Sequence, residues 1–179
     1  MKKSIVTLIM ASFAGVAFAG PPAPAPVKNP VLTPPPPPSC FNPGEWTFDT
    51  SVAGLFVDGG NELAGGGVGL TYFPTLNVGL GADYSVFSDG IHIYNANLVL
   101  RAPIESACLA LYGIGGVGGI SNGDSSLTWS AGIGVEWRCS KKSNIALFAD
   151  ARYLWVDDYA DFGDEDEAIL ARAGIRVNF

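Results

Sequence analysis

The 179-residue chain is 48% hydrophobic and carries a formal net charge of −7 at pH 7, from 10 basic and 17 acidic residues. We expect no nucleic-acid partner, because binding phosphates requires a basic surface. Three cysteines at long, irregular spacing and a single histidine give no metal-binding motif, so we also expect no metal and no cofactor.

The first 19 residues have the features of a secretory signal peptide. Two lysines precede an apolar run from Ile5 to Phe18, and Ala17-Phe18-Ala19 is typical of a small-residue cleavage site, so we expect cleavage between Ala19 and Gly20. The apolar run is too short to span a bilayer as a helix. The sequence therefore predicts export.

A proline-rich stretch, PPAPAPVKNPVLTPPPPPS, follows at residues 21–39. Proline lacks a backbone donor and favours an extended polyproline helix, so this stretch cannot build a core. We predict that residues 20–44 form a periplasmic linker. Two interpretations stay open: a disordered leader, or a tether that contacts the cell wall or another periplasmic component.

From Trp46 onward, apolar residues alternate with polar or small residues, and no stretch keeps the 3.6-residue period of a helix. The fifth segment is apolar and glycine-rich on both faces, so the sequence does not indicate which of its residues point inward. We predict an all-β domain over residues 45–179 with eight strands, at about 46–56, 67–72, 78–86, 94–101, 108–118, 129–138, 145–155 and 168–179.

Eight strands of this length can close as a soluble barrel or as its inverse, a transmembrane barrel with a polar lumen. Four tryptophans lie on the apolar faces, and the narrow lumen of an eight-stranded barrel cannot hold them. We therefore predict an antiparallel up-and-down transmembrane β-barrel. The charged residues of the other faces would form a salt-bridged lumen network: Asp49, Asp83, Arg101, Glu136, Arg138, Asp150, Arg152, Arg172 and Arg176.

Aromatic residues fall near both expected rims, as in the two interfacial girdles of membrane barrels. One girdle would contain Trp46, Tyr72, Phe73, Trp137 and Phe179. The other would contain Phe56, Tyr94, Trp129, Tyr153 and Trp155.

The signal peptide, the eight alternating strands and the last strand, AILARAGIRVNF, resemble the small outer-membrane barrels of Gram-negative bacteria, the OmpA/OmpX-like superfamily. The resemblance covers residues 45–179. It implies location in the outer membrane, contact with its lipid and lipopolysaccharide, and a signal for the barrel-assembly machinery at Ile175, Val177 and Phe179. We expect no peptidoglycan-binding domain of the kind that follows the barrel in OmpA.

Three further features suggest possible chemistry. GIGGVG at residues 113–118 matches a dinucleotide-binding pattern, but a turn follows it instead of a helix, so we interpret its glycines as barrel glycines. His92 could form a dyad with Ser85 or Ser88, although no orienting carboxylate is indicated. The acidic stretch at residues 157–167 is expected to be a solvated loop, with a divalent-cation bridge to lipopolysaccharide phosphates as the alternative.

The cysteines lie in an oxidising compartment, where disulfides persist. If the hairpin between the fifth and sixth strands turns around residues 122–125, Cys108 and Cys139 fall opposite each other. We therefore predict a Cys108–Cys139 disulfide at the periplasmic rim, with Cys40 free or paired between chains.

Taken together, these features predict an integral outer-membrane β-barrel with a structural or surface-interaction role and no enzymatic activity. The alternatives are a narrow pore for ions or small solutes, and an outer-membrane enzyme that modifies lipids.

Overall fold

Eight strands, each antiparallel to the next, make up most of the described chain. A computed structural model describes residues 39–57, 62–122, 124–141, 143–157 and 167–179. The predicted cleavage site at Ala19 and Gly20, most of the proline-rich linker and most of the acidic loop lie outside these residues. The strands are β1 (Glu45–Val57), β2 (Glu62–Phe73), β3 (Val78–Phe87), β4 (His92–Ile104), β5 (Leu109–Asn122), β6 (Asp124–Arg138), β7 (Ile145–Val156) and β8 (Glu167–Asn178).

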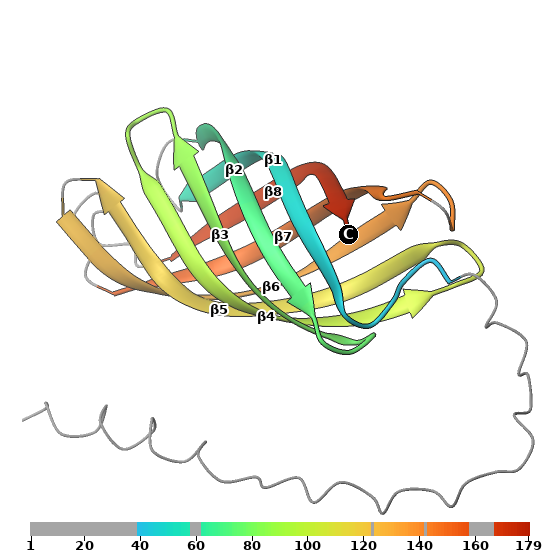
Figure 1. The fold of residues 1–179 in the computed structure, drawn as a ribbon. Helices are drawn as coiled ribbons and strands as arrows, with labels where there is room; N and C mark the ends of the chain where they lie inside the picture. The colour runs from blue at the N-terminus through green and yellow to red at the C-terminus, as the bar shows by residue number, and fades with distance from the viewer. Residues whose placement is uncertain (1–38, 58–61, 123, 142, 158–166) are drawn as a thin grey trace, which may run out of the picture. The chain divides into compact units, whose positions relative to one another are not determined.

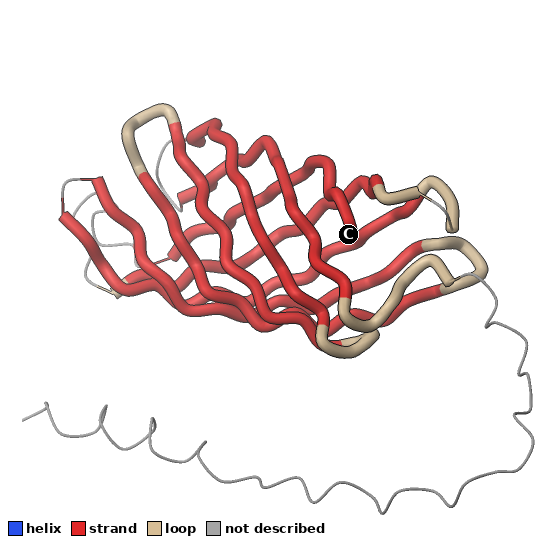
Figure 2. Tube along the Cα trace, viewed as in Figure 1, coloured by secondary structure: helices blue, strands red, loops and turns tan. Residues whose placement is uncertain are grey.

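The strands close into one barrel in chain order, because β8 pairs with β1 (Figure 1). At the seam, Trp46 and Phe179 exchange backbone hydrogen bonds of 2.8 and 2.9 Å. The connections between strands that the structure describes are short (Figure 2). The predicted eight-stranded antiparallel barrel is therefore confirmed. Among the described residues, no helix is long and apolar enough to cross a membrane.

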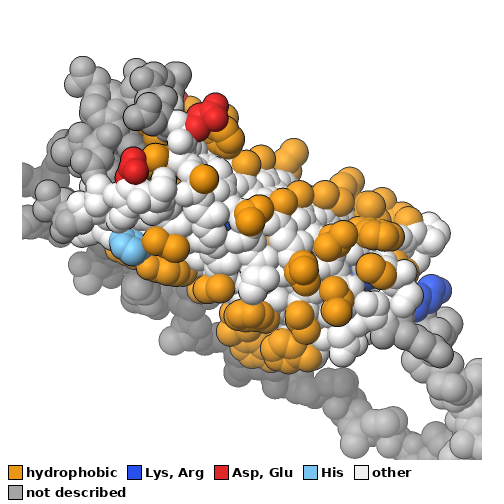
Figure 3. Space-filling view, turned by 90° about the horizontal axis from the view of Figure 1, so that it is seen from above, with side chains coloured by type: hydrophobic (Ala, Val, Ile, Leu, Met, Phe, Trp, Pro, Cys, Tyr) orange, Lys and Arg blue, Asp and Glu red, His pale blue; other side chains and the backbone are white. Residues whose placement is uncertain are grey.

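We call the end where β1 begins and β8 ends the near rim, and the end where β1 leads into β2 the far rim. Side chains alternate between the outside of the barrel and its lumen, as the period of a strand requires. Large apolar side chains cover the outside (Figure 3). Most of the acidic and basic residues within the strands point inward and are buried. A soluble monomer does not expose so much apolar surface, so this surface is suited to lipid.

The aromatic girdles are largely as expected. Trp46, Trp137 and Phe179 are exposed at the near rim, and Trp129 and Trp155 at the far rim. Phe73 was wrongly assigned to the near-rim girdle. It is 1% exposed and points into the lumen, because it follows the outward-facing Tyr72 and adjacent strand residues face opposite sides.

The lumen is divided along its length, which the alternation pattern did not predict. Its near-rim half holds the charged residues, and its far-rim half holds a cluster of buried apolar side chains that we call the apolar cap. The apolar cap consists of Ala53, Leu55, Leu63, Phe87, Ile91, Ile93, Ile120, Leu154, Val156, Ala168 and Leu170. Near the far rim both faces of several strands are therefore apolar, so the alternation is weak there.

Glycines make room for these inward side chains. A Cβ added at Gly79 would come within 2.6 Å of the Phe73 ring, and one at Gly116 would meet the side chains of Asn97 and Ser130. Gly116 belongs to the GIGGVG stretch, which is a continuous part of β5 and is followed by β6. The interpretation of these residues as barrel glycines is confirmed.

Candidate functional site

All nine charged residues predicted for the lumen are buried inside the barrel. Glu45, which the sequence analysis left out, joins them. We call these ten residues the lumen network. Its five carboxylates and five guanidinium groups balance in formal charge, and each residue takes part in at least one ion pair. Such pairing is required because an isolated buried charge costs several kcal/mol.

The part of the lumen network nearest the apolar cap contains two arginines and two aspartates. Arg172 donates to both carboxylate oxygens of Asp150, at 3.1 and 2.8 Å. Arg152 donates to Asp83 at 2.8 Å and to Asp150 at 3.2 Å. The Tyr112 hydroxyl adds a hydrogen bond of 3.1 Å to Asp150. This cluster joins β3, β5, β7 and β8 across the lumen.

Arg176 occupies the middle of the lumen network. It donates to both oxygens of Asp49, at 2.5 and 2.9 Å, and to Glu136 at 2.7 Å. Glu136 in turn accepts a 2.7 Å hydrogen bond from Nε of Arg138. Glu136 therefore links the middle of the lumen to the near rim.

At the near rim, Glu45 lies between two arginines. It accepts hydrogen bonds from Arg101 and from both terminal nitrogens of Arg138, the latter at 3.1 and 2.7 Å. Arg138 also donates to the side-chain oxygen of Asn178 at 3.1 Å. The first residue of β1 is thereby tied to β4, β6 and β8.

Residues 39–44 fold into the near-rim opening, and we call them the near-rim plug. Phe41 is 1% exposed. Its ring lies 4.9 Å from the guanidinium carbon of Arg101 and 4.2 Å from that of Arg138. Phe73 stacks against Arg101 at 3.9 Å. These cation–π contacts replace water at the arginine faces. The end of the predicted linker is thus part of the barrel interior.

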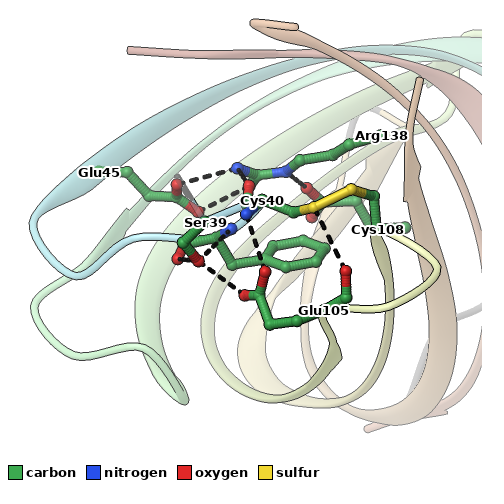
Figure 4. Close-up of a disulfide and its surroundings, with 8 residues drawn as sticks. Ser39, Cys40, Glu45, Glu105, Cys108 and Arg138 are labelled. Atoms are coloured by element: carbon green, nitrogen blue, oxygen red, sulfur yellow. Dashed lines mark hydrogen bonds and ion pairs between the residues drawn. A yellow bond between two sulfur atoms is a disulfide. The ribbon is translucent and has the colours of Figure 1, made fainter. Parts of the chain in front are cut away.

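The disulfide is Cys40–Cys108, with Cα atoms 5.4 Å apart (Figure 4). The predicted Cys108–Cys139 pair is wrong, and Cys139 is an exposed free thiol. The register pairs Leu109 with Trp137, one residue away from the register that the prediction assumed. Arg138 therefore lies opposite Cys108 and donates its backbone N–H to the Cys108 carbonyl, while Cys139, beyond the end of β6, is exposed. Cys40 instead approaches Cys108 from the near-rim plug.

Glu105, in the turn between β4 and β5, holds the start of the near-rim plug (Figure 4). Its carboxylate accepts 2.8 Å hydrogen bonds from the Cys40 backbone N–H and the Ser39 hydroxyl. Partial burial raises the pKa of Glu105, but these hydrogen bonds outweigh it and hold the pKa below its usual range. The carboxylate is therefore charged at neutral pH and remains a double acceptor.

Three residues of the site were missed by the sequence analysis. Glu45 has the same strand parity as Asp49, so extending the alternation by one residue toward the N-terminus would have found it. Phe41 and Glu105 had no such signal, because neither lies in a strand. Their roles depend on the near-rim plug folding back onto a turn 65 residues away.

The histidine dyad considered from the sequence does not form with Ser85. His92 lies on the outside of the barrel, where its Nδ1 and the Tyr84 hydroxyl share a hydrogen bond of 2.6 Å. Ser85 points into the lumen and is fully buried. Ser88 is exposed in the turn after β3. Within the described residues, no group of three or more His, Cys, Asp or Glu side chains is placed to hold a metal ion.

A closed eight-stranded sheet, an apolar outer surface and a lumen of buried ion pairs define an integral membrane β-barrel of the outer-membrane type. No protein-family model matches the chain, and no similar sequence was found among curated proteins.

Solved structures of outer-membrane barrels are similar to this one. The N-terminal β-barrel domain of Pseudomonas aeruginosa OprF has a TM-score of 0.57 and 17% identity, over 77% of this chain and 99% of that chain. Neisserial surface protein A has a TM-score of 0.54 and 17% identity, over 79% and 98%. Yersinia pestis Ail, the attachment invasion locus protein, has a TM-score of 0.52 and 17% identity, over 76% and 99%. At these identities, the similarity shows a shared fold.

Proposed function

We propose that this protein is a closed, non-conducting outer-membrane barrel whose role in the cell envelope is structural. The observation that carries the proposal is that buried side chains occupy the lumen at three levels. The apolar cap lies in the far-rim half, Cys40 and Phe41 of the near-rim plug are buried in the opposite opening, and the lumen network lies between them. The barrel then serves as a fixed membrane anchor for the N-terminal segment.

The apolar cap is the main argument against a narrow pore. Ions cross a barrel only along a hydrated path, and packed apolar side chains do not support one. Leu55, Ile93, Leu154 and Leu170 are fully buried within the cap. In the lumen network, every charge is already paired with an opposite charge, so none is free to attract a permeating ion.

The expected orientation of the barrel in the membrane indicates which partners its surfaces would contact. We infer that the near rim faces the periplasm and the far rim faces the outside of the cell, because the predicted signal peptide at residues 1–19 and the predicted periplasmic linker at residues 20–44 precede β1. The outer surface would contact membrane lipid and lipopolysaccharide. The linker would contact the cell wall or another periplasmic component. Ile175, Val177 and Phe179 all face outward and are exposed, which supports their proposed recognition by the barrel-assembly machinery.

The proposal includes no catalysis. The one histidine of the chain shares its hydrogen bond with Tyr84, and Ser85 lies on the other side of the barrel wall. A surface-interaction role is compatible with the same barrel and would depend on the far-rim loops.

Conductance in planar bilayers tests the proposal. We expect the purified wild-type protein to be silent. We also expect silence from a Cys40→Ser/Phe41→Ala variant, which loosens the near-rim plug but leaves the apolar cap intact. Reproducible channels in the wild type would overturn the proposal. Channels in the variant alone would show that the apolar cap does not seal the lumen, which would also contradict it.

A further inference from the structure

We infer that the Cys40–Cys108 disulfide makes the turn between β4 and β5, and not β1, the point where a pull on the N-terminal segment loads the barrel. This inference rests on the proposed anchoring function. It assigns a mechanical role to a covalent link that barrel closure itself does not need, because β1 already pairs with both β2 and β8.

The position of Cys40 determines the path of the force. Cys40 lies five residues before β1 begins at Glu45, and Cys108 closes the turn after β4. A pull that arrives from the N-terminal side reaches the disulfide before it reaches β1. The residues from Phe41 onward then belong to a closed loop that includes β1 to β4, and the pull does not extend them.

Further hydrogen bonds hold Ser39 and Cys40 in place beside the disulfide. Glu105 accepts hydrogen bonds from the Cys40 N–H and the Ser39 hydroxyl, both at 2.8 Å. Arg138, on the adjacent strand β6, donates a 2.5 Å hydrogen bond to the Cys40 carbonyl. The disulfide is therefore reinforced on both sides of Cys40, and all of these contacts lie N-terminal to the Phe41 ring.

The two loading points differ in how well they resist a pull. Without the disulfide, the pull would act on the free end of β1, next to the seam with β8, where backbone hydrogen bonds begin at the Trp46–Phe179 pair. At the β4–β5 turn, the pull is divided between two strands of 13 and 14 residues, which pair with each other from Ile104–Leu109 to His92–Ser121. Each of these strands also has a second neighbour, β3 or β6, as β1 has β2 and β8, so the difference lies in the number of strands that share the pull.

Single-molecule extraction from a lipid bilayer tests this inference, with the probe attached to a tag at the mature N-terminus. For the oxidised wild type, we expect the first extraction peak at a higher force than for Cys40→Ser. We also expect a total extended length shorter by about 230 Å, because the disulfide closes a loop with a sequence separation of 68 residues. Cys139→Ser, which leaves the disulfide intact, should match the wild type.

Adding a reductant to folded wild-type protein provides a second test, because the protein then folds with its native sequence before the disulfide is broken. Reduction should convert the wild-type trace into the Cys40→Ser trace. Equal first-peak forces for oxidised and reduced protein would overturn the inference, and so would equal extended lengths. Either result would leave the conductance test untouched, so failure of the force path and failure of the closed-barrel proposal are distinguishable.

Discussion

Replacing Cys40 with serine should lower the free energy of unfolding by about 4 kcal/mol, making this one of the two largest single-residue effects that the structure indicates. The disulfide closes a loop with a sequence separation of 68 residues. A cross-link over such a loop lowers the conformational entropy of the unfolded chain and so raises its free energy by about 4 kcal/mol. Urea unfolding in lipid vesicles, followed by tryptophan fluorescence under oxidising conditions, measures the loss.

Cys139 supplies the matched control. Its thiol is exposed and unpaired, so Cys139→Ser should change the free energy of unfolding by less than about 0.5 kcal/mol. If Cys139→Ser were instead the damaging substitution, the result would contradict the Cys40–Cys108 pairing and support the Cys108–Cys139 pairing predicted from the strand pattern.

The second large effect is expected from Arg176→Met. This change keeps a long apolar side chain but removes the cation that both Asp49 and Glu136 contact. Breaking one side of a buried ion pair costs about 3–5 kcal/mol, because the remaining charge stays buried without compensation. The same urea titration measures this loss.

A double variant separates uncompensated charge from lost packing. In Arg176→Met, Asp49 loses its cation while Glu136 keeps its ion pair with Arg138. In Arg176→Met/Asp49→Asn, the neutral amide removes the unpaired charge, so we expect recovery of part of the stability lost in Arg176→Met. If Arg176→Met alone lowered the free energy of unfolding by less than about 1 kcal/mol, water would have to reach this part of the lumen and screen the charges, contrary to the proposed closed lumen.

Much of this architecture follows from a two-residue period. The period located all eight strands and assigned nine charged residues to the lumen, because the charges sit at alternate positions in strands whose other face is apolar. Glu45 obeys the same rule and was missed only because the alternation was read from Trp46. Phe73 was misplaced because an aromatic residue near a rim fits a girdle by composition even when its parity points inward.

The remaining features depend on information that a period does not carry. The Cys108–Cys139 prediction failed because hairpin register must be known to one residue, and the β5–β6 pairing differs by one from the assumed turn. The near-rim plug depends on Phe41 finding Arg101 and Arg138, a contact between a loop and two distant strands. The apolar cap was not predicted because both strand faces are apolar there.

Envelope fractionation combined with gel migration tests most directly whether this chain is an outer-membrane barrel. The mature protein should be recovered with the outer membrane. Without boiling, it should migrate differently from the boiled sample, because a closed barrel resists unfolding by detergent until it is heated. Recovery from the soluble periplasm, with identical migration before and after boiling, would contradict the account.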